Sequence, residues 1–354
     1  MNRFDVMREP EKILIIRLSS IGDILLTTPL IRILKKRFPN SKIDFVIKEK
    51  FRELISHHPA LDIVYSYHKK EREKGLKKIK ERIRQQNYDI IFDIHKNFRS
   101  IYLRTAVGAG DIFKFKKFIV PRWLMVHFKI NLYKKMIPVY QRYINSGEKL
   151  GIEYDDLGLD IYISESIRDK LRQQWNADLE PEKNLVIGIA PGAGFETKRW
   201  HAEGFRAVIE DLLATHPEAR VLLFGNVKDR QITQNIIWND HPRVFDVAGK
   251  YSLMETTAMM DYCKLVITND SGLMHLASAL KKKVVAIFGS TTEHLGFFPC
   301  NKEALIIQNN ALKCRPCTHV GRKKCPKKHF KCMLDIQAVD VLNAAHLLIN
   351  SGGN

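Results

Sequence analysis

Hydrophobic and polar positions along the first half of the chain alternate in blocks that predict strands followed by helices. Four short apolar runs, at 12–18, 42–47, 62–67 and 89–95, are predicted as strands. Amphipathic stretches with helical spacing follow the first run and precede the last one. Apolar runs that alternate in this way with helices are typical of parallel βαβ units, whose strands are covered on both faces.

The second half of the chain repeats the pattern after a polar, proline-containing break. Further strands are predicted at 184–190, 220–225, 243–249, 264–270 and 284–289. The segments between these strands again have helical spacing. We therefore predict an α/β protein of two doubly wound, Rossmann-like domains, which face each other across a central cleft and bind ligands at the carboxyl ends of their strands. The predicted domains are residues 1–178 and residues 179–354.

Length and composition agree with two domains and predict a cytoplasmic protein. A chain of 354 residues exceeds the size of one ordinary core. No apolar run approaches the roughly 18 residues that a transmembrane helix needs. The amino terminus, MNRFDVMREPEK, lacks the apolar stretch of a secretory signal. In a cytoplasmic protein the six cysteines do not indicate a disulfide framework.

The net charge of +19 is concentrated in the first half of the chain. Residues 1–150 hold 33 Lys and Arg against 15 Asp and Glu, whereas residues 151–354 hold 25 against 24. Within the first half, residues 112–143 contain eight basic and eight aromatic residues and no acidic one. This pattern suits an anionic membrane interface or an anionic amphiphile, or else a buried aromatic layer whose lysines reach solvent. The excess charge indicates an anionic partner, with a solvated basic face as the alternative.

Three loops, each directly after a predicted strand, carry the candidate chemistry. In the first loop, Gly22 permits a tight turn and Asp23 begins the next helix, as either a capping carboxylate or a general base. In the second loop, PGAGFETKRW, Thr197 and Lys198 can donate to a phosphate. Neither the Walker A sequence nor G-x-G-x-x-G occurs in the first loop, so ATPase or dinucleotide chemistry has no motif there.

The third loop, TNDSGLMH, joins a predicted strand to a helix. The amides of Ser271, Gly272 and Leu273 are predicted to form an anion site at the helix amino terminus, and Asp270 can cap the helix. An acidic residue beside a diphosphate needs a compensating cation, for which Lys198 is the candidate.

Together, SSIGD, PGAGFETKRW and NDSGLMHLASAL closely resemble the glycosyltransferase family 9 heptosyltransferases, in the right order and over residues 12–345. The resemblance implies a GT-B fold and inverting transfer of heptose from ADP-L-glycero-D-manno-heptose to Kdo or heptose of the inner core of lipopolysaccharide. It implies no metal at the donor site and no cofactor. The partners expected are the ADP-sugar donor, the anionic lipopolysaccharide acceptor and the anionic inner-membrane surface, on which the protein would be peripheral; nucleic acid is not expected.

Roles for individual residues also come from the resemblance. Asp23 resembles the general base and Lys198 the lysine at the donor diphosphate. The segment LLFGNVKDR resembles the region that reaches the donor ribose, and AGKYSLME the region that lines the adenine; Asp229 and Tyr251 are the candidates within them. The remaining candidates are donor-side residues (Thr197, Asp270, Ser271, Gly272, Leu273 and His275) and acceptor-side residues (Ser20, Gly22, Lys96 and Arg99). At Lys96 and Arg99 the family pattern is loose, and a helix start capped by Asn97 is the structural alternative.

Other interpretations stay open from the sequence. A family member could use another nucleotide sugar for a different surface glycan. A non-catalytic basic module could bind RNA or membrane, although no RNP1, KH or helix-turn-helix motif is visible. Four clustered cysteines could hold zinc or remain reduced thiols in a basic lobe. These cysteines are Cys314, Cys317, Cys325 and Cys332.

Overall fold

The chain folds into two compact units, each built on one parallel sheet. The computed structural model describes residues 9–68, 70, 72–106, 110–133, 135–237 and 241–351. The first unit comprises Met1–Lys117 and Ile137–Tyr162, and the second comprises Phe118–Met136 and Ile163–Asn354. The division thus falls before the predicted domain boundary, because the helix α7 (Glu165–Leu179) belongs to the second unit.

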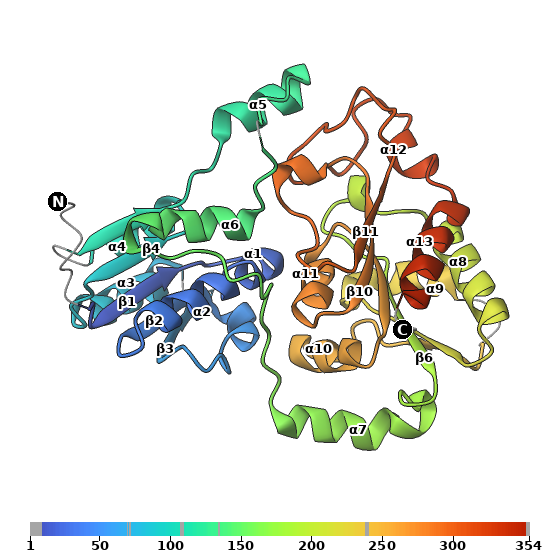
Figure 1. Ribbon diagram of the computed structural model, residues 1–354, viewed down its shortest axis with the longest axis horizontal. Helices are drawn as coiled ribbons and strands as arrows, with labels where there is room; N and C mark the ends of the chain where they lie inside the picture. The colour runs from blue at the N-terminus through green and yellow to red at the C-terminus, as the bar shows by residue number, and fades with distance from the viewer. Residues whose placement is uncertain are drawn as a thin grey trace. The chain divides into compact units, whose positions relative to one another are not determined.

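The first unit contains a five-stranded parallel sheet in the order β3-β2-β1-β4-β5 (Figure 1). Its strands are β1 (Lys12–Ile16), β2 (Lys42–Lys48), β3 (Ile63–Tyr67), β4 (Ile90–Asp93) and β5 (Asp111–Lys114). Its helices are α1 (Ile21–Leu25), α2 (Thr28–Arg37), η1 (Glu49–Leu54), α3 (Arg72–Arg84), α4 (Phe98–Arg104), α6 (Val139–Ile144) and η3 (Asn145–Leu150).

The second unit contains a six-stranded parallel sheet in the order β11-β10-β9-β6-β7-β8. Figure 1 labels β11, β10 and β6 of this sheet. Its strands are β6 (Leu185–Ala190), β7 (Ala219–Leu223), β8 (Val244–Asp246), β9 (Leu265–Asn269), β10 (Lys283–Phe288) and β11 (Ala304–Gln308). Besides α7, its helices are α5 (Ile119–Phe128), η4 (Glu196–Lys198), α8 (Ala202–Thr215), η5 (Val227–Asp229), α9 (Arg230–Ile236), α10 (Leu253–Asp261), α11 (Gly272–Ala279), η6 (Glu293–Leu295), α12 (Lys331–Leu334) and α13 (Ala338–Asn350).

The burial of the central strands explains why their sequences are continuous apolar runs. Every residue of β6 and of β9 is buried, because helices cover both faces of the sheet. In the first unit, β1 lies between β2 and β4, with Lys12 opposite Lys42 and Ile13 opposite Ile90. The carboxyl ends of β1, β2 and β4 therefore share one edge, as do those of β6, β9 and β10, and a doubly wound sheet binds its ligands at that edge.

The predicted α/β class and the two doubly wound sheets are confirmed, and the differences lie at the sheet edges. β5 and β11 were not predicted; both are edge strands. β5 (DIFK) is mostly exposed and has only two adjacent apolar residues, whereas β11 (ALIIQ) is partly buried and carries a short apolar run that was overlooked. The amphipathic stretch after β1 forms two helices rather than one, because Pro29 stands in the first turn of α2, where it needs no hydrogen-bond donor. Within the described residues, no helix is both long and apolar enough to span a bilayer.

Candidate active site

In the first unit, the loop after β1 places Asp23 in the first turn of α1. The Oδ2 atom of Asp23 accepts hydrogen bonds from Ser20 N at 3.1 Å and from Ser20 Oγ at 2.8 Å. Its Oδ1 atom forms an ion pair with Arg17. The cap residue of α1 is Ser20 and not Asp23. Asp23 is the third residue of the helix, and its carboxylate accepts from the cap residue, as in a capping box. Gly22 is buried in the same turn.

Arg17 fixes the charge state of Asp23. Burial by itself raises the pKa of Asp23, but the positive charge of Arg17 and the hydrogen bonds from Ser20 outweigh burial and hold this pKa below its usual value. Arg17 is itself held by donation to Ile94 O at 2.6 Å, and its guanidinium carbon lies 5.5 Å from the centre of the Tyr143 ring. Asp23 is therefore an ionised carboxylate at neutral pH, which is the form a general base requires.

Further cations gather at the same sheet edge. Lys48, the last residue of β2, places Nζ 3.4 Å from Ser19 Oγ. Burial, followed by the charges of Arg17, Lys117 and Lys48, lowers the pKa of His95 to about 3, although Asp23 opposes this shift. A neutral histidine ringed by cations makes this edge attractive to an anion. Sequence analysis missed Arg17, Lys48 and Lys117 as site residues; the ends of β1 and β2 were the signal for the first two.

The segment after β4 combines a structural and a candidate binding role. The backbone amide of Lys96 donates to Asp93 Oδ1 at 2.8 Å. Asn97 caps α4 by accepting from Ser100 N at 3.0 Å, so the structural alternative considered for this segment is present. Arg99, in the first turn of α4, is exposed to solvent.

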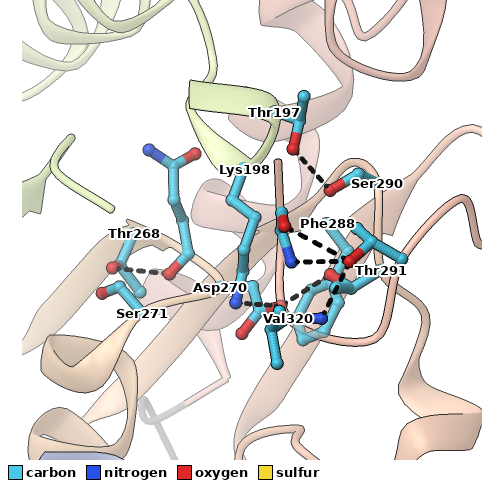
Figure 2. A network of polar contacts seen from close by, with 12 residues as sticks. Thr197, Lys198, Thr268, Asp270, Ser271, Phe288, Ser290, Thr291 and Val320 are labelled. Carbon is cyan, nitrogen blue, oxygen red and sulfur yellow. Dashed lines mark hydrogen bonds and ion pairs between the residues drawn. The ribbon is translucent and has the colours of Figure 1, made fainter. Parts of the chain in front are cut away.

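In the second unit, Lys198 and Asp270 form a largely buried ion pair. Lys198 Nζ lies 2.7 Å from Asp270 Oδ2, and the two side chains are 14% and 6% exposed. Thr291 Oγ1 donates to the same carboxylate oxygen at 2.6 Å. Figure 2 shows these side chains converging from three loops that follow β6, β9 and β10. Lys198 therefore neutralises Asp270, as the sequence predicted.

Thr197 fastens the loop that carries Lys198. Its hydroxyl lies 3.0 Å from Ser290 Oγ (Figure 2). The same hydroxyl accepts from Arg322 N at 2.8 Å. The backbone amide of Thr197 donates to Arg322 O at 3.2 Å. Because these contacts bury Thr197, its position supports the loop, whereas the sequence suggested direct donation to a phosphate.

Arg315 is a positioning residue that sequence analysis missed. Its buried guanidinium donates to Gly289 O at 2.5 Å and to Thr291 O at 2.8 Å. It also donates to Asn309 O at 2.6 Å and to Gln308 Oε1 at 2.9 Å. Arg315 thereby holds the loop of Ser290 and Thr291 against the end of β11. No local sequence signal marks this role, because three of these four acceptors are backbone carbonyls and the fourth is the side chain of Gln308 on β11.

The helix α11 begins at the same edge with Gly272. Its cap is Ser271, whose Oγ accepts from Leu273 N at 3.2 Å. The cap is thus not Asp270, and the amide of Leu273, predicted as part of an anion site, is engaged by the cap. The positive end of the helix dipole still lies beside Asp270 and Lys198. His275 is buried one turn into the helix.

Asp229 and Tyr251 lie after β7 and β8. Asp229 is buried and accepts from Asn226 N at 3.1 Å, while Arg199 lies 3.8 Å away. A Cβ atom at Gly192 would come within 2.6 Å of the Asp229 carboxyl carbon, so only glycine fits there. The hydroxyl of Tyr251 accepts from the side chains of Gln174 and Trp175 on α7, both at 2.9 Å.

The clustered cysteines lie in the segment that supports the Thr197 loop. All of them are free thiols. Burial raises the pKa of Cys332 to about 12, and Cys314 Sγ lies 3.7 Å from His329 Nε2. Among the described residues, no three His, Cys, Asp or Glu side chains are arranged to hold a metal ion.

A cavity of about 620 Å³ lies elsewhere in the second unit, around Lys183, Lys264 and Lys283. The ammonium group of Lys283 lies 3.6 Å from the carboxylate of Glu303.

The fold indicates the class of protein. Two doubly wound parallel sheets in one chain are the elements of a GT-B fold. The family model of glycosyltransferase family 9 (heptosyltransferase) matches residues 76–329. The chain belongs to this family, and it is a glycosyltransferase enzyme.

Individual relatives extend the match to nearly the whole chain. Lipopolysaccharide heptosyltransferase 1 of Campylobacter coli is 26% identical over 94% of this chain and 97% of its own length. A family 9 glycosyltransferase crystal structure from Veillonella parvula superposes with a TM-score of 0.80 at 25% identity, covering 97% of this chain and 98% of that one. The structure of E. coli ADP-heptose LPS heptosyltransferase II has a TM-score of 0.73 at 23% identity, covering 97% and 100%.

Proposed function

We propose that this enzyme transfers heptose, with inversion, from ADP-L-glycero-D-manno-heptose to Kdo or heptose of the lipopolysaccharide inner core. The observation that carries the proposal is the buried pair of Lys198 and Asp270 beside the start of α11. A lysine held there supplies positive charge where a diphosphate leaves. The names of the relatives supply the sugar and the acceptor class.

The donor belongs to the second unit in this proposal. Lys198 and the first turn of α11, with Ser271, Gly272 and Leu273, face the diphosphate, and Thr197 and Thr291 keep this arrangement in place. Asp229 after β7 serves the ribose, and Tyr251 after β8 serves the adenine. The positive charge of Lys198 offsets the negative charge of Asp270. The carboxylate of Asp270 therefore does not repel the diphosphate, although it lies close to it.

The acceptor belongs to the first unit, and Asp23 is the general base. The acceptor hydroxyl attacks the anomeric carbon from the face opposite the diphosphate, and its proton passes to Asp23 as the carbon–oxygen bond to ADP breaks. The low pKa of Asp23 keeps it ionised but makes it a weak base, so proton transfer follows late in bond formation. The cations Lys48, Lys96 and Arg99 suit the carboxylates or phosphates of an inner-core acceptor.

Another nucleotide sugar, used for a different surface glycan, is the alternative within the family. A nucleotide panel separates the two: ADP, UDP, GDP and CMP are added in turn and the melting temperature is measured, because a ligand that binds only the native state raises it. We expect stabilisation by ADP alone, followed by transfer from ADP-heptose to an isolated inner-core acceptor. A larger shift with UDP, GDP or CMP contradicts the proposed donor.

A cytoplasmic location on the inner-membrane surface follows from the acceptor, because inner-core lipopolysaccharide is made there. A purely nucleic-acid-binding role is disfavoured, because it leaves the loops of Lys198 and Asp270 without a purpose.

A further inference from the structure

Two segments of the second unit, far apart in sequence, contain no acidic residue. Residues 118–136 carry four Lys and Arg, and residues 304–334 carry eight. All eight cations of the second segment except Arg315 are exposed. Residues 151–354 as a whole have almost no net charge, so this concentration is local. We call the two segments together the basic lobe.

The two segments of the basic lobe are in direct contact. Lys129, just after α5, donates from Nζ to Pro316 O at 2.7 Å. Burial, together with the charge of Arg122 on α5, lowers the pKa of His319. On its inner side α5 buries Met125 and Val126. The sequence placed residues 118–136 in the first domain, but these contacts join them to the cysteine-rich segment.

The outer side of α5 exposes large apolar side chains. Residues 118–136 contain seven of the 20 exposed large hydrophobic residues found among the described residues. On α5 itself, Val120 is 63% exposed, Trp123 50% and Phe128 59%. The ring of Trp123 packs edge-on against Phe128, with 5.2 Å between the ring centres. Figure 1 shows α5 apart from the strands of the second sheet. An apolar surface of this density in so short a segment indicates a binding surface.

We propose that the basic lobe binds the surface of an anionic phospholipid bilayer, with Val120, Trp123 and Phe128 entering the interface. Lysines attract the headgroups, while an aromatic and aliphatic helix face enters the boundary between headgroups and acyl chains. A nucleic acid would engage the cations but leave Val120 and the neighbouring aliphatic residues exposed. This inference adds a membrane contact to the proposed function, whose acceptor is held in a membrane, and it places that contact in the unit that carries Lys198.

The first test compares two triple variants of the full chain in sedimentation with phosphatidylglycerol-containing vesicles. The lobe variant replaces Lys323, Lys324 and Lys327 with Gln. The control variant replaces three exposed lysines of α3, Lys74, Lys77 and Lys78, with Gln. Each lysine near an anionic surface contributes measurably to binding, so we expect the lobe variant to bind about tenfold more weakly or worse, and the control to bind as the wild type does. An equal loss in both variants, or no loss in the lobe variant, overturns the proposal.

The second test asks whether α5 enters the bilayer. Vesicles with brominated acyl chains should quench the fluorescence of Trp123. The chain holds three other tryptophans, Trp175, Trp200 and Trp238, so substitution of Trp123 identifies the source of the quenching. Trp123→Phe should remove the quenching and keep sedimentation, whereas Trp123→Ser should remove the quenching and also weaken sedimentation. Binding without quenching, or displacement of the vesicles by RNA at equal affinity, overturns the proposal.

ADP titration of the same preparations separates this inference from the proposed function. Normal ADP affinity in the lobe variant shows that its donor site is folded. Loss of vesicle binding with intact ADP binding then concerns the basic lobe alone. Absence of ADP binding in the wild type refutes the proposed donor and leaves the vesicle result standing.

Discussion

Replacing Lys198 with Ala tests the donor site most directly. The substitution removes the cation that lies 2.7 Å from Asp270 and leaves a carboxylate that is 6% exposed with Thr291 as its remaining described partner. A bound diphosphate would then face this carboxylate without compensation. We expect weaker ADP binding and slower transfer, because the ground state and the transition state both lose the same charge.

The magnitude follows from the geometry of the pair. Two unit charges about 4 Å apart interact by roughly 4 kcal/mol at an effective dielectric constant of 20. Removal of one donor to a developing negative charge costs about 3–4 kcal/mol in the transition state. We therefore expect a loss of about 2–4 kcal/mol in kcat/KM, which is roughly 30- to 1,000-fold. The loss should be smaller when Asp270 is also replaced by Asn, because the repelling carboxylate is then absent.

Calorimetry with ADP and steady-state transfer kinetics measure the two effects. The matched control is Lys183→Ala, which breaks an exposed lysine–carboxylate pair with Glu180 in the same unit and should change neither quantity. Melting temperatures identify any loss of stability caused by the uncompensated Asp270. Unchanged ADP affinity together with unchanged turnover would refute the assignment of Lys198 to the diphosphate.

Three further predictions concern Asp23 and Arg315. Asp23→Asn should reduce turnover by roughly 100-fold or more and leave ADP affinity unchanged, and near-normal turnover would reduce Asp23 to a helix-capping residue. The pKa of Asp23 is lower in the folded than in the unfolded chain, so its ion pair stabilises the fold above pH about 4 and is lost as the pH falls through the folded pKa. Wild-type melting temperature should therefore fall on acidification more steeply than that of Asp23→Asn, and parallel curves would contradict the pairing. Arg315→Gln removes the Arg315 donors from the buried carbonyls of Phe288, Gly289 and Thr291, so we expect a loss of about 2–4 kcal/mol in the free energy of unfolding and weaker ADP binding. Urea denaturation and calorimetry check this, and normal stability would show that other donors replace Arg315.

The sequence by itself determined the strands and the loops that follow them. Strands such as β1 and β9 are buried on both faces and therefore form apolar runs. Such a run can be recognised from its own residues, without knowledge of the distant segments that cover it. Loops after the strands of one parallel sheet share an edge of that sheet, so Asp23 in the first unit, and Lys198 and Asp270 in the second, could be identified as site candidates before any geometry was known. The edge strand β5 escaped prediction because it is mostly exposed and has only two adjacent apolar residues, whereas β11 was overlooked although it carries the apolar run ALII.

The tertiary structure alone decided which side chains become partners. Arg17 pairs with Asp23, and Arg315 holds carbonyls of another loop, because folding brings together groups whose sequence separation carries no periodic signal. The same reason explains the basic lobe. Residues 118–136 read as part of the first half, yet the contact of Lys129 with Pro316 joins them to a segment almost 190 positions away. The residue types of a segment determine which kinds of partner it can contact. The fold of the whole chain determines which of those partners lies next to it.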